Sequence, residues 1–229
     1  MPKPPRYRPE EFTAAAEPRP ARAARPRDAA SLLLWRPTRR GAEVLMGLRS
    51  ARHRFMPGVL VFPGGRVDAA DRAAPAARPL PEATRAALEH RASPRLAHGL
   101  GIAALRELAE ETGLHLSAET PRGWLPDLGR LDYLCRALTP TLSPVRFNAR
   151  FLIAPGEAAE GALGGSGELE HLGWYALDRA LPHPPALITA RVLEEFRAWL
   201  AMSEAERLAR PLVWFQGRDN RKIERAKPG

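Results

Sequence analysis

The sequence predicts a layered α/β domain, on the basis of two observations. Short apolar runs with the length of β-strands are interspersed with helix candidates, which is the pattern of a sheet covered by helices. Hydrophobic residues make up 45% of the 229 residues and charged residues 27%, so the chain can form a core. At this length, one domain with an insertion or tails is favoured over two full domains.

The first part of the chain is expected to hold a β-hairpin and a third strand. The hairpin strands are the apolar runs Ala29–Trp35 and Glu43–Leu48, joined by a turn around Pro37–Gly41. Val59–Phe62 is the third strand candidate, and Pro63–Gly65 is expected to end it.

Residues 72–98 differ from their surroundings and are predicted to be an insertion. They begin with a Pro-rich stretch, continue with a helix candidate at Glu82–Arg91, and are expected to be broken near Pro94. Leu100–Thr112 follows as the strongest helix candidate, with Gly113 just past its end as a C-terminal stop.

The second part of the chain is expected to hold two strands, a loop, a last strand and a terminal amphipathic helix. These elements are Leu128–Ala137, Arg146–Ala154, Gly156–Gly167, Leu172–Leu177 and Pro185–Met202. The predicted domain therefore runs from residue 28 to residue 203, and residues 204–229 form a C-terminal extension.

The net charge of +9 is concentrated in two tails. Residues 1–27 hold seven Lys or Arg and three Glu, giving +4, and residues 216–229 hold five Lys or Arg and two acids, giving +3, so residues 28–215 carry +2. Residues 1–27 are therefore predicted to be a flexible basic lead-in, and the C-terminal extension is predicted to end in a basic tail. This distribution does not favour a dedicated nucleic-acid surface.

Composition also bears on the location of the protein. No apolar run reaches the roughly 20 residues of a membrane helix. The single cysteine, Cys135, can form neither an internal disulfide nor a thiolate zinc site. The N-terminal residues lack the apolar stretch of a secretory signal, and their Arg content leaves a transit peptide as the alternative. We therefore expect no membrane partner and a cytoplasmic location.

Three carboxylates gather on one face of the strongest helix candidate. Glu107, Glu110 and Glu111 are spaced i, i+3 and i+4 and repel each other unless a cation lies between them. Oxygen ligands suit Mg²⁺ or Mn²⁺ rather than zinc, and a solvated acidic face is the alternative. The residues expected to pack against the sheet lie on a different arc of the helix and are Ile102, Leu105, Leu108 and Ala109.

The sequence around these carboxylates resembles the box of the Nudix superfamily. That box has Gly, five residues, Glu, seven residues, and then Arg-Glu-aliphatic-any-Glu-Glu-any-Gly-aliphatic. Arg106 to Leu114 match every fixed position of the second half, and Gly65 and Asp71 have the spacing of the first half, with Asp71 in place of Glu. Residues 72–105 separate the two halves where the family has seven residues, so about 27 residues are inserted.

The resemblance implies a Nudix-type α/β/α sandwich with a mixed central sheet and an inserted helical segment. It also implies an enzyme that uses Mg²⁺ or Mn²⁺, with Glu110 and Glu111 as metal ligands and Glu107 as a ligand or general base. Arg106 would orient Glu107 by a charge-assisted hydrogen bond, and the Gly65 carbonyl would complete the metal shell. Such a site screens diphosphate charge and lowers the pKa of water.

A further acid is often recruited to sites of this kind. The candidates here are Asp71, Glu168 and Glu170. For the last two, ordinary solubility of a loop is the alternative interpretation.

The stretch before the box, Leu48–Gly65, resembles that of coenzyme A diphosphatases, with a shared Arg-Ser, a following Arg, a Gly and Phe-Pro-Gly-Gly. An insertion within the box is also a feature of one branch of these enzymes, and Thr139–Phe151 is similar to that branch. Arg49, Arg54 and Arg66 are therefore predicted to bind substrate phosphates, for which guanidinium groups are suited. A solvated basic loop is the alternative.

The expected function is metal-dependent hydrolysis of coenzyme A or acyl-CoA to 3′-phosphoadenosine 5′-phosphate and (acyl-)4′-phosphopantetheine. Two alternatives stay open. One is a hydrolase for NADH, ADP-ribose or dinucleoside polyphosphates, and the other is a nucleotide-sensing or nucleic-acid-binding module with the same fold. The presence of all three box carboxylates favours an enzyme. The expected partner is a small-molecule nucleotide diphosphate, and a homodimer stays open.

Overall fold

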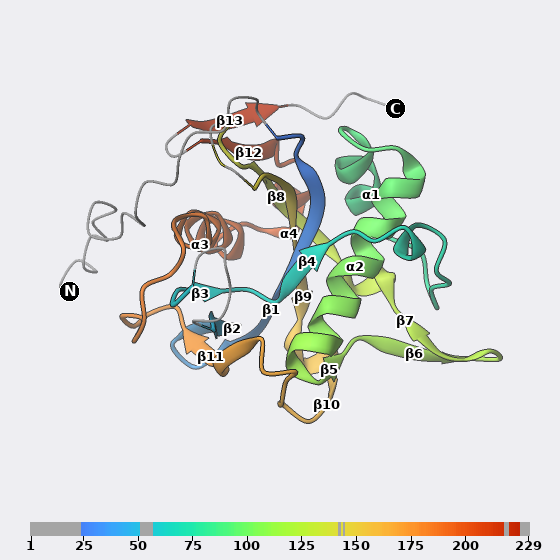
Figure 1. The fold of residues 1–229 in the computed structure, drawn as a ribbon, viewed down its shortest axis with the longest axis horizontal. Coiled ribbons are helices and arrows are strands. Elements are labelled where there is room, and N and C mark those ends of the chain that lie inside the picture. The colour runs from blue at the N-terminus through green and yellow to red at the C-terminus, as the bar shows by residue number, and fades with distance from the viewer. Residues whose placement is uncertain (1–23, 51–56, 142, 144, 218–219, 225–229) are drawn as a thin grey trace.

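The computed structural model describes residues 24–50, 57–141, 143, 145–217 and 220–224, and one large sheet dominates it (Figure 1). The strands of this sheet are Arg27–Thr38 (β1), Gly41–Arg49 (β2), Leu60–Val61 (β3), Gly64–Arg66 (β4), Asp132–Leu138 (β8), Phe147–Pro155 (β9), Leu169–Ala176 (β11), Leu212–Gln216 (β12) and Asn220–Glu224 (β13). Their order is β11-β2-β1-β9-β8-β12-β13, with β3 paired to β2 and β4 paired to β1. The sheet is mixed, because β1 runs parallel to β9 and β12 runs parallel to β8, while the hairpin pairs are antiparallel.

Helices cover both faces of the sheet, so the predicted α/β/α arrangement is confirmed. The longer helices are α1 (Glu82–Glu89), α2 (Pro94–Thr112) and α3 (Leu187–Leu200). The first two lie on one face and α3 lies on the other (Figure 1). In β1, Leu32 and Leu34 belong to the core beneath α2, whereas Leu33 belongs to the core beneath α3. A strand that is buried on both faces needs this unbroken apolar run.

The predicted hairpin is confirmed, and the third strand, β3, ends before Pro63 as predicted, but a further strand directly after it was not predicted. β1 and β2 pair antiparallel around the expected turn. Residues 64–66 form β4, which pairs with β1. A Cβ on Gly64 would lie 2.6 Å from the Cα of Ser31, so this close approach of two backbones requires glycine.

The insertion contains the predicted helix, α1, but α2 begins earlier than expected, at Pro94 rather than at Leu100. Ser93 caps α2 by accepting a hydrogen bond from the Leu96 N–H at 3.3 Å. Pro94 fits the first helical position, where a backbone N–H would have no partner in the helix. Pro94 therefore starts a helix instead of breaking one, and the last residues of the predicted insertion, 94–98, form the first part of α2.

The predicted packing face of α2 is largely confirmed. Ile102, Leu105 and Leu108 are buried in the core beneath the helix. Ala109 was expected to join them and is exposed instead, because it lines an open cleft rather than the core.

Two small sheets between α2 and the end of the chain were not predicted. Their strands are Leu114–His115 (β5), Ser117–Thr120 (β6), Gly123–Pro126 (β7) and Glu160–Gly161 (β10). β5 pairs with β10, inside the stretch predicted to be a loop, and β6 and β7 form a hairpin that projects beside α2 (Figure 1). The predicted strand Leu128–Ala137 is shorter, because Asp127 caps a 3-10 turn at Leu128–Arg130 and β8 begins at Asp132.

The C-terminal region also differs from the prediction. Leu172–Leu177 was expected to be the last strand, but a short helix, α4 (Glu204–Leu208), and then β12 and β13 follow it. β12 pairs with β8, so the sheet continues beyond residue 203, where the predicted domain ended. The buried carboxylate of Glu195 accepts hydrogen bonds from Arg210 at 3.0 Å and from Arg221 at 3.2 Å, which joins α3 to this added edge.

The predicted N-terminal lead-in falls mostly on residues 1–23, which lie outside the described residues; Arg27, at its end, opens β1. The basic tail likewise falls in part on residues 225–229, outside the described residues. Among the helices that the structure describes, none combines the length and the apolar character needed to cross a bilayer.

Candidate active site

The candidate site lies where β4 meets the C-terminal half of α2 (Figure 1). The Gly64 N–H donates a hydrogen bond to Glu111 Oε2 at 2.8 Å. A Cβ on Gly65 would lie 2.7 Å from Glu107 Oε2, so the Glu107 carboxylate occupies the space that a side chain at this position would need. The Pro-Gly-Gly turn and the two carboxylates, which are more than 40 residues apart, thus form one surface.

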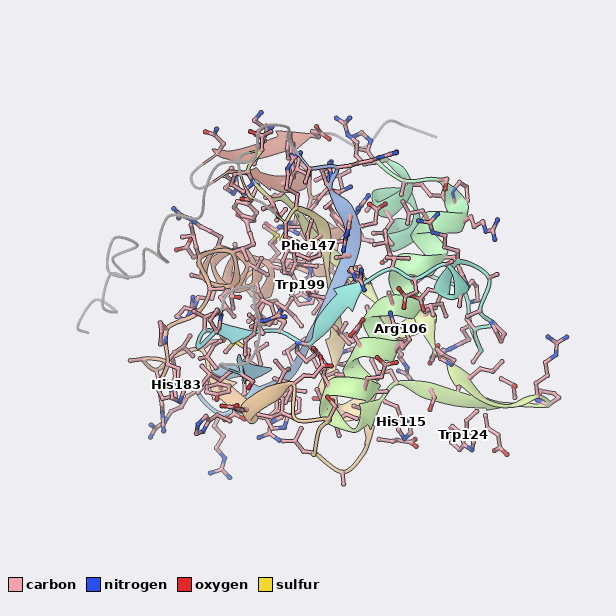
Figure 2. The ribbon with its side chains drawn as sticks, in the orientation of Figure 1. Arg106, His115, Trp124, Phe147, His183 and Trp199 are labelled. Atoms are coloured by element: carbon pink, nitrogen blue, oxygen red, sulfur yellow. The ribbon has the colours of Figure 1, made fainter. Side chains whose placement is uncertain are left out.

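Arg106, labelled in Figure 2, donates hydrogen bonds to several acidic groups around it. Its Nε and Nη2 donate to the two carboxylate oxygens of Asp71 at 3.0 and 3.1 Å. Its Nη1 donates to Glu107 Oε1 at 2.9 Å and to Glu110 Oε2 at 3.0 Å, and its Nη2 also donates to the Arg66 carbonyl at 3.0 Å. Hydrogen bonding to Asp71 is the main reason that the pKa of Arg106 is raised. The guanidinium is therefore a fixed cation that holds Glu107 in place.

Asp71 has a different place from the one predicted for a further acid. Its side chain is only 4% exposed, and both of its oxygens accept hydrogen bonds from Arg106. Asp71 Oδ2 also accepts from the Asp68 N–H at 2.8 Å. Both oxygens of Asp71 are thus engaged by Arg106, which Asp71 positions. Its spacing from Gly65, which is that of the first acid of the box, was the signal in the sequence.

The surroundings of the two inner carboxylates, those of Glu107 and Glu111, disfavour their ionised forms. Burial raises the pKa of Glu111 to about 8, the Gly64 N–H opposes this rise, and the charge of Glu107 adds to it. Burial also raises the pKa of Glu107, and the neighbouring Arg106 offsets only part of that effect. A bound cation would favour the ionised form of both groups.

Glu110 stands apart from this inner pair. Its side chain is 57% exposed and accepts a hydrogen bond from Arg106. Among the described residues, no three or more His, Cys, Asp or Glu side chains are arranged so that they could hold a metal ion by themselves. The carboxylate of Glu107 lies against the backbone of Gly65, and that of Glu111 lies against Gly64, so these residues offer hard oxygen donors of the kind that Mg²⁺ or Mn²⁺ prefers.

The two remaining acid candidates differ in position. Glu168 is exposed, and its charge contributes to the raised pKa of both Glu107 and Glu111. Its carbonyl accepts a hydrogen bond from the Ser50 N–H at 3.3 Å, which holds this loop beside the end of β2. Glu170 lies two residues further along, paired with Leu48 in β11. The structure therefore brings Glu168 to the site in preference to Glu170.

The three candidate arginines are also separated. Arg49 ends β2, and its charge lowers the pKa of Glu111, so it lies beside the carboxylates. Its Nε is buried and has no hydrogen-bond partner among the described residues. The side chain of Arg66 is exposed on β4, and Arg54 lies outside the described residues. Sequence reasoning found Arg49 but not its buried, unsatisfied nitrogen.

Comparisons with known proteins point to one fold. No protein-family model and no curated protein matches the sequence. Among solved structures, a NUDIX hydrolase from Alicyclobacillus acidocaldarius is 28% identical, covers 80% of this chain and 96% of its own, and has a TM-score of 0.61. The NUDIX domain of Shewanella oneidensis NrtR complexed with ADP ribose is 18% identical over 85% of this chain and 94% of its own, with a TM-score of 0.48. The chain has the Nudix fold, and its likeness to the first structure supports a Nudix-type diphosphatase.

Proposed function

We propose that this Nudix-type hydrolase cleaves the diphosphate linkage of coenzyme A or acyl-CoA in a reaction that depends on Mg²⁺ or Mn²⁺. The products would be 3′-phosphoadenosine 5′-phosphate and (acyl-)4′-phosphopantetheine. The observation that carries the metal-dependent chemistry is the inner pair of half-buried and buried carboxylates, Glu107 and Glu111, set against the side-chain-free backbone of Gly64 and Gly65.

The residues of the site have different roles in the proposed hydrolysis. Glu107, Glu111 and Gly65 hold the cation, with Glu110 available from the exposed side of the helix. A bound Mg²⁺ or Mn²⁺ supplies charge neutralisation for the diphosphate and a lowered pKa for water. Arg106 already occupies Oε1 of Glu107, so Oε2 is the atom placed to accept the proton of the attacking water. The water oxygen bonds to phosphorus as the bridging P–O bond breaks, and the electron pair leaves with the second phosphate.

Arg49 supports the choice of coenzyme A among nucleotide diphosphates. Coenzyme A carries a 3′-phosphate that ADP-ribose and NADH lack, so its recognition needs a well-placed cation. A buried guanidinium nitrogen without a partner among the described residues is poised to bind such an anion. Arg66 on β4, together with Arg54, which lies outside the described residues, is proposed as a further phosphate contact.

A product-resolved substrate screen tests this function. The full chain with Mg²⁺ is incubated with coenzyme A, acetyl-CoA, NADH, ADP-ribose and a dinucleoside polyphosphate, and the products are separated. We expect 3′-phosphoadenosine 5′-phosphate and 4′-phosphopantetheine to accumulate fastest, and a chelator to stop the reaction. Cleavage of NADH or ADP-ribose but not of coenzyme A would reject the coenzyme A assignment and keep the diphosphatase. Tight binding of nucleotides without cleavage of any of them would indicate a sensing module instead.

A further inference from the structure

A second hollow lies on the flank of α2, next to the candidate site. It is an open cleft of about 660 Å³ between α2 and the β6–β7 hairpin. This volume is within the range of about 300–1,000 Å³ that is usual for small-molecule sites. The apolar residues that line it are Leu105, Ala109, Leu116, Trp124, Leu125 and Pro126, and the polar ones are Arg106, His115, Ser117 and Glu160.

The cleft is continuous with the carboxylate site through Arg106. This side chain lines the cleft and donates hydrogen bonds to Glu107 and Glu110 at its border. On a helix, residues three apart share a face, so Arg106 and Ala109 lie side by side and Glu110 follows directly. Ala109 is exposed, and its methyl group leaves room for a ligand to pass along the helix. A substrate bound at the carboxylates can therefore extend into the cleft.

Trp124 gives the cleft its apolar wall. Its side chain is 58% exposed on β7, which makes it the most exposed tryptophan that the structure describes. Figure 2 shows Trp124 and His115 on the same side of the molecule as Arg106, around the C-terminal half of α2. His115 Nδ1 and Ser117 Oγ are 2.8 Å apart, so a polar pair faces the apolar wall.

We propose that this cleft receives the pantetheine arm of the substrate, together with the acyl chain of an acyl-CoA. The inference rests on the proposed function. Arg49 ends β2 and pairs with Leu169, next to Glu168, so the 3′-phosphate and adenosine end is placed on that side of the site. The other arm then extends past Arg106 to the flank of α2. Its methyl and acyl carbons fit the apolar wall, and its amide groups match His115, Ser117 and Glu160 at the rim.

A binding measurement tests the subsite without hydrolysis. The full chain with Mg²⁺ is titrated with 4′-phosphopantetheine or with 3′-phosphoadenosine 5′-phosphate, and tryptophan emission is followed. We expect 4′-phosphopantetheine to change the emission in the wild type and in Trp214→Phe, a control on the distant β12, but not in Trp124→Phe. An equal change in wild type and Trp124→Phe would overturn the proposal, as would no change at all.

A kinetic measurement tests the same subsite through selectivity. In the wild type, kcat/KM should rise by roughly two- to fourfold for each acyl methylene that enters the cleft, as expected for burial of a CH₂ group. Trp124→Ala should flatten this rise and also lower kcat/KM for unacylated coenzyme A, because the pantetheine arm contacts the same apolar wall. An unchanged rise in Trp124→Ala would overturn the subsite while the diphosphatase stands. If coenzyme A is not cleaved but the emission change is lost in Trp124→Phe, the proposed function fails and the pantetheine subsite stands.

Discussion

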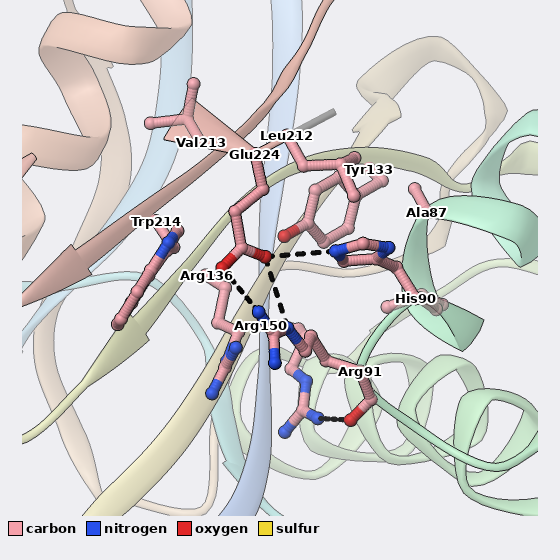
Figure 3. Close-up of a pocket in the computed structure, with 11 residues that line it drawn as sticks. Ala87, His90, Arg91, Tyr133, Arg136, Arg150, Leu212, Val213, Trp214 and Glu224 are labelled. Carbon is pink, nitrogen blue, oxygen red and sulfur yellow. Dashed lines mark hydrogen bonds and ion pairs between the residues drawn. The ribbon is translucent and has the colours of Figure 1, made fainter. Parts of the chain in front are cut away.

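Charged side chains cluster near both ends of α2, and the two clusters differ in their balance of acidic and basic groups. The cluster near the N-terminal end, here called the anchor cluster, consists of Asp28, His90, Arg91, Arg136, Arg150 and Glu224. In it, Glu224 accepts hydrogen bonds from Arg91 at 2.6 and 3.1 Å and lies 3.0 Å from His90 Nε2, while Arg150 donates to the Arg91 carbonyl at 3.2 Å (Figure 3). The space left among these groups is about 10 Å³, at most room for one water.

The cluster at the C-terminal end of α2 is deficient in positive charge. Four carboxylates, those of Glu107, Glu110, Glu111 and Glu168, face Arg106 and Arg49, and Arg106 also serves Asp71. Burial and mutual repulsion raise the pKa of both Glu107 and Glu111. The comparison teaches that cations outnumber acids in the anchor cluster, where three arginines face two carboxylates, whereas acids outnumber cations at the end of the helix where we propose that a metal ion binds.

The largest effect on activity is expected when one of the excess carboxylate charges is removed. Glu111→Gln keeps the shape of the side chain but removes a ligand charge, so kcat should fall by about two to three orders of magnitude. Glu170→Gln, which changes an exposed acid on β11, is the matched control and should retain activity. The activity of both variants is measured as turnover of coenzyme A, the proposed substrate, with and without chelator. Full activity of Glu111→Gln would mean that this carboxylate does not bind the metal.

In the metal-free enzyme, the excess of carboxylates should make the free energy of unfolding depend on pH. Burial raises the pKa of Glu111 from its ordinary 4.5 to about 8. A folded-state pKa above the unfolded value gives stability that is present below the unfolded pKa and lost as pH rises through the folded one. The free energy of unfolding in chelator should therefore decrease between pH 4.5 and pH 8, by an amount on the order of a few kcal/mol.

Two comparisons sharpen this result. Mg²⁺ should restore stability at pH 8, because the ion binds the deprotonated carboxylates. Glu111→Gln should have a flatter profile than the wild type in chelator, since it carries no titrating group at this position. Urea unfolding at several pH values measures all three. A wild-type profile as flat as that of the variant would show that Glu111 is ionised without metal.

A smaller effect is expected at the phosphate-binding side. Arg49→Ala should lower kcat/KM for coenzyme A by roughly ten- to a hundredfold, because a bidentate or buried Arg–phosphate contact is lost. It should affect 3′-dephospho-coenzyme A much less. Arg85→Ala, which removes an exposed arginine on α1, is the matched control. Equal losses with the two substrates would mean that Arg49 supports the site without contacting the 3′-phosphate.

The sequence predicted the residues of the candidate site, at the C-terminal end of α2, better than those of the anchor cluster near its N-terminal end. The positions of Glu107, Glu111 and Gly65 follow from the helical period and from a short motif, so local pattern was sufficient. In the anchor cluster, Arg91 pairs with Glu224, which lies 133 residues further along the chain, and no local sequence pattern predicts such a pair. The same reason explains why β12 and β13 were missed, since their strand character depends on the edge offered by β8.

The smallest effect is expected in the anchor cluster. Glu224→Gln should leave kcat and KM within about twofold of the wild type and lower the free energy of unfolding by up to about 1 kcal/mol, since the pair is partly exposed. Hydrogen bonding from Arg91 holds the pKa of Glu224 below its ordinary value. A lowered folded-state pKa gives stability that is present above the unfolded pKa and lost as pH falls through the folded one.

The difference in stability between wild type and Glu224→Gln should therefore be constant near neutral pH and vanish in acid, as Glu224 becomes protonated. Thermal unfolding from pH 7 to pH 3, with activity measured in parallel at pH 7, tests both parts of this prediction. The pH trend is opposite in sign to that expected for Glu111, because one carboxylate is stabilised by a fixed cation and the other is buried without one. If Glu224→Gln lost activity in proportion to the loss in Glu111→Gln, the anchor cluster would be coupled to the chemistry, and the division of α2 into a holding end and a reacting end would be wrong.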